Sequence, residues 1–193
     1  MTWVVGPDHF DEREGAMPVK LVVCGGYGAG KTTFVGAISE IVPITTEAPI
    51  TEVSVGTDEG AAATKVATTV ALDFGRISLD SGLVLYLFGT PGQSRFRFAW
   101  DQVATGAIGA VILVDSRRIE DAFPSLDFCE ARGIPFAVAV NRFDGLLVHD
   151  LAAVRAALAL DGEIPVLGID ARSRADAKGT LIALDLHALR STA

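Results

Sequence analysis

The sequence predicts an α/β domain in which a mostly parallel sheet of six strands, one of them antiparallel, carries helices on both faces. Short apolar runs alternate along the chain with longer amphipathic stretches, which is the order expected of strands and helices in such a sheet. The apolar runs are almost uninterrupted, as in strands that are buried on both faces. A glycine-rich loop follows the first run and marks the edge of the sheet where ligands bind.

The expected elements follow one another in order from residue 18. The turn at residues 80–82, Asp-Ser-Gly, joins two runs into a hairpin, so one strand runs against the others. Residues 1–17 are acidic and show no periodicity, so we expect a mobile leader there and a single domain over residues 18–193. The expected strands are residues 19–24, 66–72, 83–88, 110–114, 136–140 and 165–169, and the expected helices are residues 31–41, 95–105, 119–132, 150–160 and 175–189.

Residues 25–32 read GGYGAGKT, directly after the first strand and before a helix-forming stretch. This is the P-loop pattern G-x-x-x-x-G-K-[ST] in the context that it requires, so it predicts a P-loop NTPase that binds a nucleoside triphosphate. Glycines let backbone N–H groups turn toward phosphate oxygens, and the helix directs its positive end to the same place. Lys31 is expected to reach the outer phosphates and Thr32 to bind Mg²⁺. The expected phosphate-binding residues are Gly28, Ala29, Gly30, Lys31, Thr32 and Thr33.

A second motif, NRFD at residues 141–144, follows the strand at residues 136–140 and has the N-[K/R]-x-D layout that binds guanine. A carboxylate at Asp144 accepts two hydrogen bonds from guanine N1–H and the N2 amino group, which adenine cannot offer. We expect Asn141 to tie this loop to the phosphate loop, Arg142 to cover one face of the base, and the Ala171 N–H to meet guanine O6. The expected base-side residues are Asn141, Arg142, Asp144, Ala171 and Arg172.

The second strand of the hairpin ends in FGTPGQ at residues 88–93. In order and spacing, the three motifs together resemble the Ras-like small GTPases over nearly the whole chain after the leader, which implies a Ras-like G domain. The resemblance implies that the Gly92 N–H touches the γ-phosphate and that Gln93 orients the attacking water. T-P-G-Q resembles the bacterial MglA branch, and more closely the small GTP-binding proteins of actinobacterial conservon operons (the CvnD-like group), including a mycobacterial member.

Three positions depart from the family pattern. Gly89 stands where the family has aspartate, Tyr27 where it has glycine, and Thr68 where the MglA branch has arginine. The Tyr27 ring either crowds the γ-phosphate or points away to pack on a switch. These departures remove space or positive charge from the γ-phosphate, so they predict slow hydrolysis.

The resemblance gives Thr69 as the switch threonine that reaches Mg²⁺ and the γ-phosphate, although a threonine here also suits a plain strand. Asp73 either compensates for the aspartate missing at position 89 or caps its strand. The catalytic residues implied are therefore Lys31, Thr69 and Gln93, and the metal ligands are Thr32 and Thr69.

The segment at residues 43–65 breaks the alternation, because it is rich in Thr, Glu, Ala and Gly and contains two prolines. Loops of this length inside a domain are usually functional or disordered. Its place after the phosphate loop suggests a nucleotide-sensing switch, and a plain surface insertion is the alternative.

Composition excludes several partners. The net charge of −8 argues against nucleic acid or an anionic membrane surface. No apolar run approaches the roughly 20 residues of a membrane helix, and neither terminus carries a lipidation motif. Cys24 and Cys129 suit buried thiols in a reducing compartment, so we expect a cytoplasmic protein without a lipid anchor.

The function expected is that of a small GTP-binding switch that binds GTP or GDP with Mg²⁺, hydrolyses GTP slowly and changes partners with the nucleotide. A nucleotide-binding scaffold without useful turnover is one alternative, and a small P-loop phosphotransferase is another. The family resemblance implies a roadblock-type regulatory partner, and a pentapeptide-repeat protein is a further expected partner.

Overall fold

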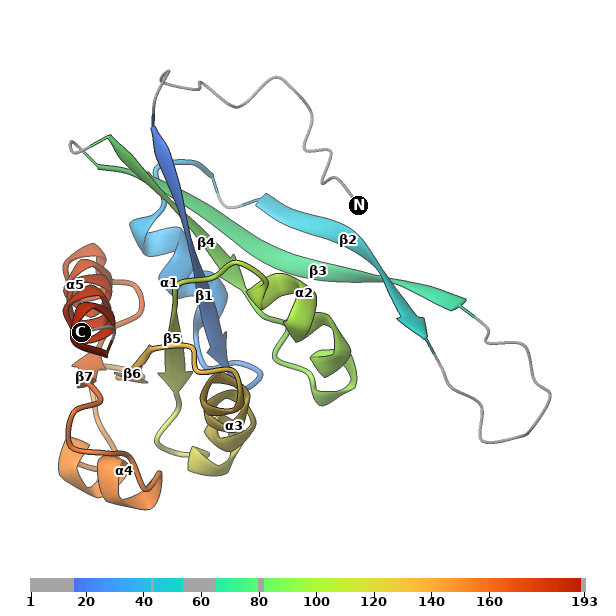
Figure 1. Ribbon diagram of the computed structural model, residues 1–193. Helices are drawn as coiled ribbons and strands as arrows, with labels where there is room; N and C mark the ends of the chain where they lie inside the picture. Colours follow the sequence, from blue (N-terminus) through green and yellow to red (C-terminus); the bar gives the residue numbers. More distant parts are fainter. Residues whose placement is uncertain (1–15, 43, 54–64, 80–81, 192–193) are drawn as a thin grey trace, which may run out of the picture.

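The computed structural model describes residues 16–42, 44–53, 65–79 and 82–191. In them one sheet of seven strands lies between two layers of helices, with the strand order β2-β3-β4-β1-β5-β6-β7 (Figure 1). The strands are β1 (Met17–Gly25), β2 (Ile44–Val53), β3 (Lys65–Ser78), β4 (Leu83–Gly89), β5 (Gly109–Val114), β6 (Phe136–Asn141) and β7 (Val166–Ile169). The helices are α1 (Lys31–Ile38), α2 (Trp100–Ala104), α3 (Phe123–Ala131), α4 (Leu151–Ala157) and α5 (Arg174–Ser191), with 3₁₀ segments η2 (Ser94–Ala99) and η3 (Ile119–Ala122).

All strands but β3 run in one direction. β1 pairs in parallel with β4 on one side and β5 on the other, and β6 and β7 continue the parallel order. β3 is antiparallel to both of its neighbours, β2 and β4. The predicted fold class is therefore confirmed, and all six expected strands are present. The helices in the described part of the chain are too short or too polar to cross a membrane.

β2 adds a seventh strand at the edge of the sheet, inside the segment that the sequence predicts to be one long loop. Its ten residues pair with the first ten residues of β3. Threonine, isoleucine and valine favour the extended backbone, and Pro49 is tolerated because an edge strand has only one neighbour. The prediction of a loop over residues 43–65 is wrong for residues 44–53, which form β2, and for Lys65, which begins β3, while residues 43 and 54–64 lie outside the described residues.

The two faces of the sheet are covered by separate apolar clusters. α1 and α5 pack on one face, and α2, α3 and α4 pack on the other. Every residue of β5 and β6 is buried, as their uninterrupted apolar sequences require. The loops at the carboxyl ends of these central strands therefore start from a well-packed frame.

The stretch after β4 is held against this frame by Trp100. The expected helix over residues 95–105 is instead divided into η2 and the short α2. Trp100 is buried at the start of α2, where its indole N–H donates to the Pro91 carbonyl at 3.0 Å and its ring packs edge-on against Phe128. This contact fixes the T-P-G-Q stretch beside the carboxyl ends of β1 and β4.

Candidate functional site

The phosphate loop curves from the end of β1 into α1 at the carboxyl edge of the parallel strands. Its residue Gly30 caps α1 with a left-handed backbone, φ +107°, and its carbonyl accepts the first helical hydrogen bond from Phe34 N–H at 2.8 Å. A side chain on Gly30 would also collide with the Asn141 amide, because a Cβ there would lie 2.6 Å from Nδ2. The N-terminal N–H groups of α1 are therefore open toward the inside of the loop, as an anion requires.

Lys31 lies inside the curve of the loop and is only 8% exposed. Its Nζ donates to the Gly25 carbonyl at 3.0 Å and to the Gly26 carbonyl at 2.7 Å. An ammonium has three donors, so the third has no acceptor among the described residues. Burial lowers the pKa of Lys31, while Cys24 and Asp73 act in the opposite direction. A phosphate oxygen at the third donor would compensate for that desolvation.

Thr32 is connected to the neighbouring sheet strands through Asp73. The Thr32 hydroxyl donates to Asp73 Oδ2 at 2.7 Å. Asp73 lies inside β3, directly across from the end of β4, and a Cβ on Gly89 would come within 2.9 Å of the Asp73 Cβ. The glycine at position 89 thus leaves room for a carboxylate supplied by the adjacent strand. The alternative that Asp73 caps its strand is wrong, because β3 continues to Ser78.

Thr69 is not brought to this place. It lies within β3 opposite Pro49, four residues before Asp73. At about 3.3 Å per residue, that spacing puts it about 13 Å from Asp73 along the strand. Its role as a metal ligand stays a prediction that requires β3 to move.

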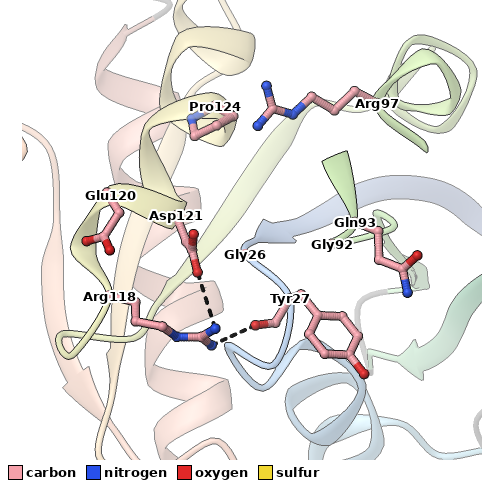
Figure 2. A pocket seen from close by; sticks show the side chains of 9 residues that line it. All are labelled: Gly26, Tyr27, Gly92, Gln93, Arg97, Arg118, Glu120, Asp121 and Pro124. Carbon is pink, nitrogen blue, oxygen red and sulfur yellow. Dashed lines mark hydrogen bonds and ion pairs between the residues drawn. The ribbon is translucent and has the colours of Figure 1, made fainter. Parts of the chain in front are cut away.

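Gly92 and Gln93 lie on the other side of the phosphate loop. Gly92 is so close to the loop that a Cβ would lie 2.6 Å from Lys31 Nζ and 2.9 Å from the Tyr27 backbone. Gln93 and Tyr27 line a cavity of about 500 Å³ between the loop, η2 and the start of α3 (Figure 2). Tyr27 is 66% exposed, and its ring is directed away from Arg118. The ring therefore neither fills the loop nor is buried against the stretch after β4.

Asn141 joins three segments at the carboxyl edge. Its buried side chain donates from Nδ2 to the Ala29 carbonyl at 3.1 Å, and its Oδ1 accepts the Ala171 N–H at 3.1 Å. The end of β6 is thereby tied to the phosphate loop and to the loop after β7. The Ala171 N–H is engaged by Asn141 in this arrangement, so its contact with a base stays a prediction.

The other base-side residues lie around Asp144. Asp144 is exposed and adopts φ +54°, a left-handed conformation that aspartate tolerates better than most residues. Arg142 Nη2 donates to the Gly168 carbonyl at 2.7 Å. Arg172 donates two hydrogen bonds to the Asp170 carboxylate and holds the pKa of Asp170 at about 2.

The sequence analysis missed three residues in the loop after β5. The carboxylate of Asp115, 4% exposed, accepts hydrogen bonds from Arg117 Nε at 2.8 Å and Nη2 at 2.7 Å. Arg117 also covers the Phe143 ring at 3.9 Å, and Arg118 donates to the Tyr27 carbonyl at 2.8 Å. The signal was available, because DSRR at residues 115–118 directly follows a fully buried strand at the same edge as the NRFD motif.

Two kinds of comparison place the chain among known proteins. The model of the family described as "Conserved hypothetical ATP binding protein" matches residues 23–190, so the chain belongs to this family. An uncharacterized protein of Methanocaldococcus jannaschii is 26% identical over 128 residues, which are 65% of this chain and 71% of that protein.

Solved G domains share the fold at low sequence identity. The Arl6 BBS3 small GTPase of Trypanosoma brucei, solved with the nucleotide analogue GppNp, has a TM-score of 0.62 at 17% identity, covering 91% of this chain and 99% of that one. The G domain of the T. maritima FeoB iron transporter has a TM-score of 0.58 at 18% identity, covering 92% of this chain and 100% of that one. The fold is therefore that of a P-loop G domain.

Proposed function

We propose that this family member binds guanine nucleotides, with GTP as its substrate, and that it acts as a slow GTPase. The observation that carries the proposal is the connection made by Asn141, which fixes the NRFD loop beside the phosphate loop through the Ala29 carbonyl. The loop that carries Asp144 is thereby held beside the phosphate loop, as binding of one nucleotide by both loops requires. The family description speaks of ATP. A carboxylate acceptor favours guanine, because guanine offers it two donors.

Mg²⁺ fits the residues around Thr32. No group of three His, Cys, Asp or Glu side chains capable of holding a metal exists within the described ranges. Mg²⁺ does not need one, because it usually keeps several waters and takes substrate phosphates with one or two protein oxygens. We propose that Thr32 is a direct ligand and that Asp73, hydrogen-bonded to Thr32, orients it and the metal-bound waters. When bound, the ion would neutralise charge on the phosphate oxygens.

The residues around the expected γ-phosphate position support the proposal of slow hydrolysis. Gln93 lines the cavity beside Tyr27, where it would orient a water. Arg118 lines the same cavity, but its guanidinium is committed to the Tyr27 carbonyl and to Asp121. Arg97 also lines this cavity, and its guanidinium lies 5.9 Å from the centroid of the Trp100 ring. An arginine on the transferring phosphate contributes about 10³–10⁵ in rate, and both arginines that line the described cavity are engaged elsewhere, so we expect turnover on the order of 10⁻⁴ s⁻¹.

A scaffold without turnover is the second candidate function, favoured by the place of Thr69 within β3, opposite Pro49. Single-turnover release of phosphate from bound GTP separates the two. A phosphotransferase is the third candidate, because that function does not explain why Asn141 joins the NRFD loop to the phosphate loop.

The T-P-G-Q stretch supports assignment to the MglA and conservon branch. With it we propose switching between partners, of which a roadblock-type regulator is the first and a pentapeptide-repeat protein the second. Cys24 and Cys129 are both buried and unbridged, which supports the cytoplasm as the compartment.

Calorimetric titration with GDP and ADP in the presence of Mg²⁺ tests the proposal. We expect GDP to bind at least 100-fold more tightly than ADP. Asp144→Asn should lose about 100-fold in GDP affinity and improve binding of xanthosine diphosphate, whose O2 accepts from the new amide. Equal affinities of the wild-type protein for GDP and ADP would show that the base-side argument is wrong.

A further inference from the structure

We propose that Asp115 is a positioning residue that holds the NRFD loop and the phosphate loop in one arrangement through Arg117 and Arg118. We call these three residues the arginine bracket. The proposal rests on the proposed function, because it assigns the NRFD loop to the base and the P-loop to the phosphates. None of the three residues was expected from the known motifs of the chain.

The sheet places the arginine bracket between the two loops. β5 lies between β1 and β6 in the strand order, and all three are parallel. The loop after β5 therefore emerges between the phosphate loop, which follows β1, and the NRFD loop, which follows β6. Asp115 is the first residue after β5 and is almost completely buried.

On the base side, Arg117 is held in a single orientation. Its backbone N–H donates to Asp115 Oδ1 at 3.0 Å, and its side chain makes a two-pronged contact with both carboxylate oxygens. The guanidinium then covers the Phe143 ring at 3.9 Å from Cζ to the ring centroid. Phe143 directly precedes Asp144, whose charge also acts on Arg117. Arg117 thus supports the loop that presents the base-reading carboxylate.

On the phosphate side, Arg118 holds the loop at Tyr27. Its Nη2 donates to the Tyr27 carbonyl at 2.8 Å and lies 3.7 Å from Asp115 Oδ2 (Figure 2 shows the Tyr27 contact). Asp121 forms a second ion pair with Arg118 at 3.5 Å. Tyr27 stands where the Ras-like pattern has glycine. The hydrogen bond from Arg118 therefore fixes the loop backbone at a position that carries a bulky side chain.

One carboxylate serves both arginines, and that is why the residue must be aspartate. Two adjacent guanidinium groups repel each other unless an anion lies between them. A carboxylate accepts the fork of Arg117 and still attracts Arg118, whereas an asparagine amide offers one oxygen and no charge. Loss of Asp115 should therefore disturb both loops at once, while loss of either arginine should disturb one.

Two affinity ratios, measured by calorimetry with Mg²⁺, separate the two sides. The base ratio is Kd for inosine diphosphate over Kd for GDP, because inosine lacks the N2 amino group that Asp144 reads. The phosphate ratio is Kd for GDP over Kd for GppNHp. Asp115→Asn should lower both ratios about tenfold, Arg117→Ala only the base ratio, and Arg118→Ala only the phosphate ratio. The matched controls are two exposed residues outside the site, Asp127→Asn and Arg174→Ala, which should leave both ratios unchanged.

The outcomes separate the inference from the function on which it rests. Asp115→Asn that alters one ratio or neither, or that weakens all nucleotides by one factor, would overturn the inference. If Asp115→Asn does not fold, the double variant Arg117→Ala/Arg118→Ala takes its place and should lower both ratios. The single variant Asp115→Glu keeps the carboxylate, so both of its ratios should lie between those of the double variant and those of the wild-type protein. A wild-type base ratio of one would mean that Asp144 does not read the N2 amino group, which overturns the base half, while the phosphate ratio still decides the other half. Failure of guanine binding itself would show separately, as equal affinities of the wild-type protein for GDP and ADP.

Discussion

The two sides of β1 deliver their site residues in different ways. On the side of β5, β6 and β7, each functional residue lies at the carboxyl end of a parallel strand or in the loop directly after it. On the side of β4, β3 and β2, the carboxylate at Thr32 comes from within the antiparallel strand β3. Parallel strands present residues from their carboxyl ends, so such residues can be predicted from the sequence because they stand next to an apolar run. An antiparallel strand presents a residue from its interior only by its register, which the sequence does not reveal.

The largest effect should come from breaking the connection on the parallel side. Asn141→Ala removes the partner of the Ala29 carbonyl and of the Ala171 N–H, and the region is buried. We expect a loss of about 3 kcal/mol in the free energy of unfolding, because two buried polar groups are left unpaired. Urea denaturation followed by circular dichroism measures it. Gln102→Ala, an exposed amide on α2, is the control. A loss under about 1 kcal/mol would mean that water replaces the asparagine.

The antiparallel side can be tested by moving its carboxylate. Gly89→Asp introduces the aspartate of the Ras-like pattern but sets a side chain against Asp73, 2.9 Å from Cβ to Cβ. We expect a loss of about 2 kcal/mol in unfolding free energy, from overpacking and from like charges.

The double variant Asp73→Ala/Gly89→Asp should regain most of that stability, since the carboxylate is then supplied from β4. Gly162→Asp, in an open loop with no atom near the added Cβ, is the control. A double variant less stable than Gly89→Asp alone would refute the exchange of the carboxylate between strands.

Metal dependence sharpens the comparison further. Asp73→Ala should raise the Mg²⁺ concentration needed for half-maximal GDP retention about tenfold, because Thr32 loses its orienting acceptor. Thr69→Ala should change it less than twofold if β3 keeps its present place. Nucleotide release at a series of Mg²⁺ concentrations measures both. The reverse order of effects would mean that β3 shifts to bring Thr69 to the metal.

The smallest effect concerns acid on the parallel side. Arg172 holds the pKa of Asp170 at about 2, below the value of about 3.9 for an unperturbed aspartate. A depressed carboxylate stabilises the fold above its unfolded pKa, and that contribution is lost as pH falls from about 4 to about 2. Asp170→Asn should therefore make unfolding slightly less sensitive to pH in that window. Acid titration of the thermal midpoint checks this, with Glu163→Gln as control. A steeper dependence of the thermal midpoint on pH in Asp170→Asn than in the wild-type protein would contradict this prediction.

The sequence predicted those parts of the protein whose structure depends on residues that are consecutive in the chain. The strand–loop–helix around Lys31 is local, because glycines, the apolar run and the helix former are consecutive. NRFD was found for the same reason, since Asn141 ends a buried strand. The six apolar runs gave six strands, because burial on both faces leaves a composition that can be read directly.

Tertiary structure decided what depends on pairing between distant residues. β2 lacks an apolar period, so only its backbone pairing with β3 makes it a strand. Asp73 meets Thr32 across 41 residues, and Arg118 meets the Tyr27 carbonyl across 91. The physical reason is that register and strand order set such contacts. They follow from how the sheet packs as a whole, and no local preference of aspartate or arginine specifies them.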